Sequence, residues 1–312
     1  MPRIRGFYYW MLAPLAVFLV LTALIFTTGT PSSGDLMRQA SASFGDVKRG
    51  TFSFEIAITP KGSATAEPST IRLTGPFELL PGKPLPLAKI NYTVSSAGRS
   101  QVVELLTTGD KAYTMIRGQA YELPASATRQ LRKATTQLSS GGKQGQSAGL
   151  TGLKLNFDKW LVDPQIGAGA EIDGTPTWRT RAGVNVVSAL KDLTASAQAL
   201  GGVTGTKVPK LSLSDIKQLK DSFKNATVEV FVGRYDRIVR KLALTMDFTT
   251  PAQLAATTGG ISGGRLNLTI GISKPNKPVN VKPPANPLPF KALQSLSQGG
   301  QSGTALDDGL GK

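Results

Sequence analysis

Residues 228–248, VEVFVGRYDRIVRKLALTMDF, alternate between apolar and polar side chains on both sides of a short polar break at 233–237. A period of two places every second side chain on the same face of a strand, so this stretch predicts a β-hairpin with one apolar face. A folded domain must cover such a face with a packed core or turn it toward an apolar ligand. These two outcomes imply different functions.

Several other segments show the same strand-like pattern, separated by turns rich in Gly, Pro and Asn. They lie at 51–58, 70–79, 88–96, 101–107, 111–116, 169–174, 176–181 and 265–273. The short connections favour antiparallel pairing, so we predict an α+β fold with one large curved sheet of about nine or ten strands.

The remaining segments of the chain predict helices and irregular regions. Apolar residues recur at helical spacing in 35–47, 184–200 and 212–224. Residues 135–152, TTQLSSGGKQGQSAGLTG, are low in complexity and predict a flexible insertion in the domain. A Pro-rich segment then ends the folded part, and residues 291–312 predict a disordered tail.

The N-terminal region contains a candidate membrane anchor. Residues 7–26, FYYWMLAPLAVFLVLTALIF, are 20 positions without a charge, which is long enough to span a bilayer as a helix. Arg3 and Arg5 precede it and favour a cytosolic N-terminus for residues 1–6. Residues 27–34 then form a linker, and the domain at 35–290 lies outside the cytoplasm. The alternative is a secreted protein with a cleaved signal peptide, although the apolar run is long for one.

Composition excludes most enzyme mechanisms. The chain has no cysteine and no histidine, so it lacks a thiol nucleophile, the usual general base and the commonest metal ligand. Matches to Gly-x-Ser-x-Gly at Ser147 and Ser262 therefore have no histidine to activate the serine. We expect no enzyme activity, no metal and no cofactor.

The charge balance favours anionic partners. Lys and Arg outnumber Asp and Glu by 36 to 20, a formal net charge of +16. Such a chain is attracted to nucleic acid or to acidic phospholipid, although a solvated basic surface without a partner is the alternative. Export of the domain argues against a nucleic-acid partner.

The order of several short motifs resembles a known family. The motifs are Leu161–Pro164, Ile172–Thr175, Val184 and Leu190, the hairpin Val228–Val232 and Ile238–Leu242, and the closing Pro278–Val281 with Pro283, Pro284 and Pro287. In this order they resemble the actinobacterial LppX/LprAFG lipoprotein family of the LolA-like superfamily, over about residues 35–290. The lipobox cysteine of that family is absent, and the apolar segment at 7–26 would replace the lipid anchor.

The resemblance implies a LolA-like half-barrel, in which a curved antiparallel sheet wraps a few helices and encloses a cavity for acyl chains of lipids or lipoglycans. The expected function is lipid transport or envelope maintenance by a membrane-anchored extracytoplasmic protein. The alternative is a ligand-free, envelope-sensing interaction module of the same fold, like RseB.

The apolar alternations supply the candidate lining of the cavity. Periodicity alone favours a plain core for these residues, and the resemblance makes a cavity the competing interpretation. The predicted lining residues are Phe52, Phe54, Ile56, Val102, Leu105, Tyr113, Met115, Val228, Val230, Val232, Leu242, Leu244, Met246, Leu268 and Ile270. Lys83, Lys89 and Arg99 are candidates for attracting an anionic headgroup at the mouth.

Overall fold

The computed structural model describes residues 36, 39–40, 43, 47–62, 67–140, 160–189, 222–250 and 260–299. Within these ranges no helix has the length and apolar character needed to cross a membrane. The predicted anchor at 7–26 and linker at 27–34 lie outside the described residues. So do residues 141–152 of the predicted insertion and residues 300–312 of the predicted tail.

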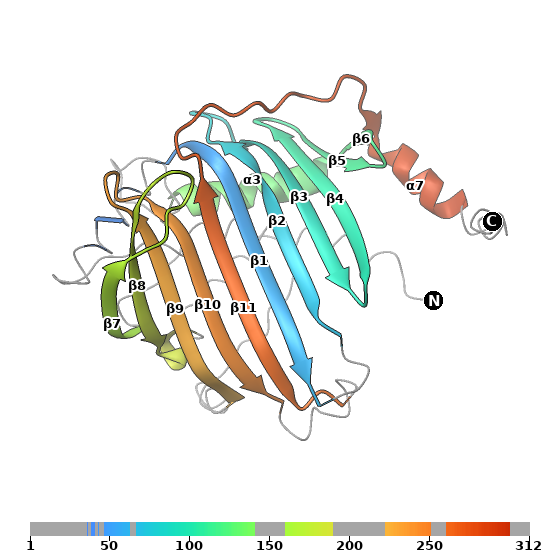
Figure 1. Cartoon of the computed structure of the whole chain (residues 1–312). Coiled ribbons are helices and arrows are strands. Elements are labelled where there is room, and N and C mark those ends of the chain that lie inside the picture. Colours follow the sequence, from blue (N-terminus) through green and yellow to red (C-terminus); the bar gives the residue numbers. More distant parts are fainter. Residues whose placement is uncertain are drawn as a thin grey trace, which may run out of the picture.

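One strongly curved sheet of twelve strands organises the described chain (Figure 1). Its order is β12-β6-β5-β4-β3-β2-β1-β11-β10-β9-β8-β7, and neighbours are antiparallel except for β12 and β6. The predicted antiparallel pairing thus holds for all neighbours but this short parallel pair, which makes the sheet mixed. The strands are β1 (Arg49–Lys61), β2 (Ser69–Glu78), β3 (Leu87–Ser96), β4 (Arg99–Thr108), β5 (Ala112–Ile116), β6 (Gln119–Glu122), β7 (Leu161–Ala168), β8 (Thr177–Val184), β9 (Phe223–Gly233), β10 (Val239–Thr249), β11 (Gly263–Ser273) and β12 (Leu288–Pro289).

The apolar alternations of the central strands share one face, which we call the inner face. Phe54 of β1 pairs with Ile270 of β11, and Ile270 in turn pairs with Leu242 of β10. Directly paired residues point to the same side of a sheet, so the register extends one apolar surface across these strands. Buried side chains from β1, β2, β3, β9, β10 and β11 form one core cluster on this face.

The opposite, outer face is largely polar and carries cross-strand ion pairs. Lys89 and Glu104 approach to 3.0 Å, and Arg265 and Asp247 to 2.8 Å. Exposed pairs of this kind each contribute at most about 1 kcal/mol. The outer face is therefore the water-facing side, and the fold depends on what covers the inner face.

The helix α3 (Ala125–Ser140) covers part of the inner face and lies behind the sheet in Figure 1. Its Leu131 is 4% exposed and belongs to the same core cluster as Phe52. The helix α7 (Phe290–Gly299) follows β12 at the opposite edge from β7 (Figure 1). Between β11 and β12, Val281 packs on Leu106 and Tyr113.

The structure confirms the strand predictions that rest on strict alternation. Strands β1 to β5, β8 and β11 lie at the predicted positions to within a few residues, and β9 and β10 form the hairpin predicted from 228–248. In the predicted helix 35–47, the described residues Leu36 and Ala40 are helical and buried.

Other secondary-structure predictions were wrong. The strand predicted at 169–174 is instead β7 at 161–168, because Asp173 and Gly174 have positive φ and form a turn bridged by Ile172 and Thr175. Residues 186–189 of the predicted helix 184–200 are helical, and Leu190 to 200 lie outside the described residues. The helix predicted to reach 224 gives way to β9 at Phe223.

Two segments predicted to be irregular are helical. α3 continues to Ser140 and so includes the first residues of the predicted insertion at 135–152. α7 spans Phe290–Gly299, where the disordered tail was predicted to begin. The closing residues Pro278–Val281 are not a strand, and the last strand is the two-residue β12.

Candidate functional site

The inner face is buried at one end and partly exposed at the other. Along β1, Phe52 is 0% exposed, Phe54 is 3%, Ile56 is half-buried and Ile58 is 36% exposed. Along β11, Ile272 and Ile270 are buried, whereas Leu268 and Leu266 are half-buried. We call the end where β1 begins the closed end and the end where β1 finishes the open end.

An apolar row crosses the open end from strand to strand. The registers align Val228, Leu244, Leu268, Ile56, Ile71 and Val94, one residue from each of six neighbouring strands. Strands lie about 4.8 Å apart, so the row is about 24 Å long. The acyl chains of one leaflet occupy about half of the 30 Å bilayer core, or about 15 Å. The row is therefore long enough to accommodate an acyl chain lying across the strands.

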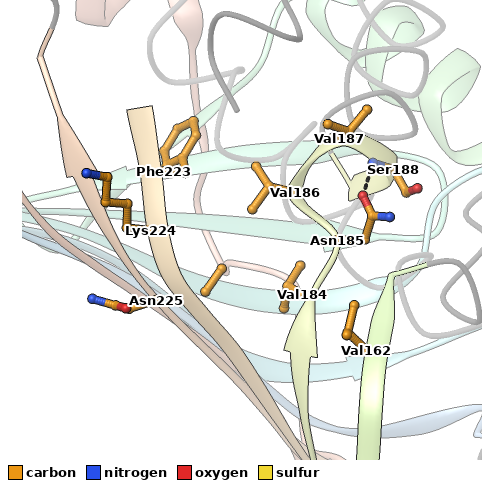
Figure 2. Close-up of a pocket in the computed structure, with 10 residues that line it drawn as sticks. Val162, Val184, Asn185, Val186, Val187, Ser188, Phe223, Lys224 and Asn225 are labelled. Carbon is orange, nitrogen blue, oxygen red and sulfur yellow. Dashed lines mark hydrogen bonds between the residues drawn. The ribbon is translucent and has the colours of Figure 1, made fainter. Parts of the chain in front are cut away.

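A pocket of about 800 Å³ lies beside this row, at the β8–β9 side of the sheet (Figure 2). Its volume falls in the range of about 300–1,000 Å³ that is typical of small-molecule sites. In Figure 2, Phe223 lies on the side of β9 that faces Val184 and Val186, whereas Lys224 and Asn225 extend from the other side. The residues that line the pocket are Val162, Val184, Asn185, Val186, Val187, Ser188, Phe223, Lys224, Asn225 and Ala226.

The lining of the pocket is positioned by a short helical turn and by a bulge. The Asn185 side chain accepts a hydrogen bond of 3.1 Å from the Ser188 backbone N–H and so caps the turn that carries Val186 and Val187. In β9 the register with β10 shifts between Thr245 and Asp247, where Asn225 has a φ of 52°. The bulge re-aims the start of β9.

After this bulge, Phe223 pairs with Phe248 of β10. In β8, Ala182 pairs with Val228, so Val184 lies one step further toward the open end on the same face. The pocket therefore lies directly beside the apolar row.

The bulge is held from the outer face by an acidic residue. Asp247 accepts hydrogen bonds from Arg265 Nε at 2.8 Å and from Asn225 Nδ2 at 2.9 Å. The hydrogen bond from Arg265, followed by that from Asn225, lowers the pKa of Asp247 to about 2. Asp247 therefore remains ionised at neutral pH and ties β9, β10 and β11 together beside the pocket.

The inner face itself is a low-polarity environment. Burial raises the pKa of the Tyr92 phenol, which lies on β3 opposite Leu73. Two hydroxyls on this face, those of Thr114 and Thr180, are buried and have no hydrogen-bond partner among the described residues. This part of the inner face therefore offers few polar partners and behaves as an apolar surface.

The structure brings twelve of the fifteen predicted lining residues together on the inner face. Those at the closed end lie in or against the core cluster, and those at the open end are half-buried; whether any of them contacts a ligand remains a prediction. The closed-end group is Phe52, Phe54, Val230, Val232, Leu242 and Ile270, with the half-buried Leu105, which pairs with the buried Ile90; Val228 lies at the boundary, and the open-end group is Ile56, Leu244, Met246 and Leu268.

The other three predicted lining residues lie on the outer face. Val102 is 63% exposed there, and Tyr113 and Met115 pair with Leu106 and Glu104 of β4. The cause is the period of the strand, because Val102 and Leu105 are three positions apart and must point to opposite sides. β4 is apolar on both faces, so its alternation does not indicate which face is the inner one.

Some open-end residues were absent from the predicted lining. These residues are Ile58, Ile71 and Leu266, and they lie in strands that were predicted. Each is two positions from another residue of the inner face, so extending the same alternation would have included them. Phe223 was missed because its segment was read as a helix.

Three of the remaining candidate residues have structural partners, namely Ser262, Lys83 and Lys89. Ser262 Oγ donates to the Lys61 carbonyl at 3.3 Å, while Ser147 lies outside the described residues. Lys83 pairs with Asp110 at 2.6 Å, and Lys89 lies on the outer face with Glu104. In the described part of the chain, no group of three His, Cys, Asp or Glu residues could hold a metal ion.

Comparison with known proteins adds structural neighbours only. No protein-family model matches the chain, and no curated protein matches it. The structure is similar to that of LprF from Mycobacterium bovis, with 16% identity, a TM-score of 0.37, and coverage of 83% of this chain and 100% of that chain. It is also similar to the lipoprotein LppX from Mycobacterium tuberculosis, with 13% identity, a TM-score of 0.37, and coverage of 80% and 97%. A putative outer membrane lipoprotein-sorting domain from Vibrio parahaemolyticus aligns at 7% identity and a TM-score of 0.16, covering 74% and 87%. The structural neighbours of this chain thus include LprF and LppX, of the LppX/LprAFG family that its sequence resembles.

Proposed function

We propose that this protein binds the acyl chains of lipids or lipoglycans at the open end of its inner face, outside the cytoplasm, for lipid transport or envelope maintenance. One observation carries the proposal. Five of the six residues of the apolar row are half-buried rather than buried, and the row lies beside a pocket of about 800 Å³. A core that served only to hold the sheet together would be closed at both ends.

The energetics of an acyl chain fit such a surface. Moving a C16 chain from water to an apolar site gains about 0.8 kcal/mol per methylene, or about 12 kcal/mol before the costs of ordering the ligand. Such affinity requires no charged contact. The inner face, uncharged along the whole apolar row in a chain of net charge +16, is suited to this kind of ligand.

The sequence resemblance supports the same proposal. In the LppX/LprAFG family the cavity takes acyl chains, and here the predicted helix at 7–26 would hold the domain on the extracytoplasmic side of the membrane. The lipid would then be taken up or released close to the bilayer surface.

Two measurements on the purified full-length chain test the proposal. Organic extraction followed by mass spectrometry should recover a co-purified lipid, and titration with a fluorescent fatty acid should saturate once any bound lipid is removed. A chain that carries no lipid and does not bind the fluorescent fatty acid would exclude the proposal. A ligand-free interaction module would then be the better explanation of the fold.

A further inference from the structure

The open end of the inner face changes from apolar to polar along one row of the sheet. The registers align Leu266, Ile58, Ser69, Ser96 and Arg99, one residue from each of the strands β11, β1, β2, β3 and β4. Leu266 and Ile58 are apolar, whereas the other three residues carry hydroxyl or guanidinium groups. The corner formed by β2, β3 and β4 is therefore the polar end of this row.

The hydroxyl groups of this corner are close together. Ser69 Oγ and Ser96 Oγ lie 3.1 Å apart. Each hydroxyl has one donor and two acceptor positions, so the pair keeps hydrogen-bonding capacity for a ligand. Ile58 pairs directly with Ser69, which places the apolar surface one strand away, or about 5 Å.

Arg99 supplies the charge of the corner. Among the paired inner-face positions of β11, β1, β2, β3 and β4, Arg99 is the one with a charged side chain. It pairs with Ser96 across a tight turn in which Ala97 and Gly98 have positive φ, so its backbone position is fixed by the hairpin.

No carboxylate in the described ranges forms an ion pair with Arg99, whereas Lys83 and Lys89 are paired with Asp110 and Glu104. A guanidinium group presents a planar fork of donors that matches the oxygens of a phosphate or carboxylate. An exposed arginine without such a partner, beside two serine hydroxyls, has the chemistry to recognise an anion.

We propose that Ser69, Ser96 and Arg99 bind the phosphate or carboxylate headgroup of an anionic amphiphile. Its chain would extend from Ile58 to Leu266, the apolar part of the row that contains Arg99, and on toward the pocket. This inference rests on the proposed function and adds the class of lipid: an anionic lipid is preferred over a neutral one with the same chain.

The test compares two ligands with one palmitoyl chain, the anionic lysophosphatidylglycerol and the neutral monopalmitoylglycerol, on the full-length chain. A charge-assisted hydrogen bond to arginine corresponds to an affinity difference of at least about tenfold. We expect the wild-type chain to prefer the anionic ligand by this factor. Arg99→Gln should abolish this preference and leave the affinity for the neutral ligand unchanged. Arg99→Lys, which keeps the positive charge, should retain part of the preference for the anionic ligand.

Arg117→Gln is the matched control, because Arg117 is an exposed arginine with a φ of 51° in another hairpin turn, between β5 and β6. It should preserve the preference. Equal affinity for the two ligands in the wild type, or a preference that survives in Arg99→Gln, would overturn the inference and leave acyl-chain binding intact. Failure of both ligands to bind would overturn acyl-chain binding as well. Glycerol phosphate, which has no acyl chain, should bind far more weakly than lysophosphatidylglycerol. Equally tight binding of the two would show that the site recognises a free anion and not a lipid headgroup.

Discussion

Leu244 and Val230 lie on neighbouring strands of the inner face but differ in burial. Leu244 is half-buried at the open end, whereas Val230 is 2% exposed in the core. A close-packed site does not accept added volume, while an open apolar site does. Replacement of each residue by tryptophan therefore distinguishes a binding surface from a core.

We expect Leu244→Trp to weaken fatty-acid binding while the protein keeps a cooperative thermal transition. Val230→Trp, the matched control, should destabilise the fold by about 1–3 kcal/mol because its site is full. Fluorescence titration and thermal unfolding of both variants measure these effects. If Leu244→Trp destabilises the fold as much as Val230→Trp, the open end is core and not a binding surface.

The ionisation of Asp247 should make the stability of the fold depend on pH in the acid range. Its pKa is lowered from 3.8 to about 2 in the folded chain, chiefly by the hydrogen bond from Arg265. A carboxyl group with a lowered folded pKa stabilises the fold above its unfolded pKa, and this stabilisation disappears as the pH falls through the folded value. The contribution should be complete above about pH 4 and lost between about pH 4 and 2.

Thermal unfolding of the wild type and of Asp247→Asn over this pH range tests the point. The wild type should be the more stable protein at about pH 5, and the gap between the two melting temperatures should shrink as the pH approaches 2. A gap that does not change with pH would show that ionisation of Asp247 does not contribute.

At the scale of elements, the β9–β10 hairpin depends on a partly buried ion pair. Arg240 is 5% exposed and pairs with Asp236, whose other carboxylate oxygen accepts the Ile238 backbone N–H at 3.1 Å. Asp236→Ala leaves the arginine buried without its carboxylate, which should cost about 1–3 kcal/mol in denaturant unfolding. The double variant Asp236→Ala/Arg240→Met should regain part of this loss, because no buried charge is then left unpaired. Equal stabilities of the single and double variants would contradict this account of the hairpin.

The close approach of β2 to β3 depends on a glycine. A Cβ atom added to Gly75 would lie 1.9 Å from the Lys89 carbonyl oxygen, and the register with β3 is interrupted between Thr74 and Phe77. Gly75→Ala should therefore destabilise the fold by about 1–3 kcal/mol.

Gly167→Ala on the edge strand β7 is the control, since an added Cβ meets nothing within 4 Å there, and it should change stability by less than about 0.5 kcal/mol. Chemical denaturation of both variants gives the comparison, and two equal effects would be inconsistent with the close approach at Gly75.

Strands were predictable from sequence where one face alone is apolar, as in β1, β10 and β11, because burial of one face imposes a period of two. The prediction failed where that signal is weak. α3, with the sequence ASATRQLRKATTQLSS, has few apolar residues to reveal a helical stripe. β4 is apolar on both faces, so Val102 could not be assigned to the outer face from its own sequence.

At the scale of the whole molecule, the sheet combines a closed end and an open end in one apolar face. This difference could not be predicted from the sequence, because Phe54 and Ile58 belong to one alternation and differ only in what covers them. The pocket likewise depends on the bulge at Asn225 and on the pairing of β8 with β9, contacts between segments that are distant in the chain. The sequence supported an apolar face, and the structure showed which part of it is open.

The most direct test of the central claim is photo-crosslinking of the full-length chain with a fatty acid that carries a diazirine on its chain, followed by peptide mapping. Acyl-chain binding at the open end predicts labelled peptides from β1, β10 and β11, at residues such as Ile58, Leu244 and Leu266. Competition with unlabelled palmitate should remove the label. Labelling confined to outer-face residues such as Val102, or label that palmitate does not displace, would contradict the account.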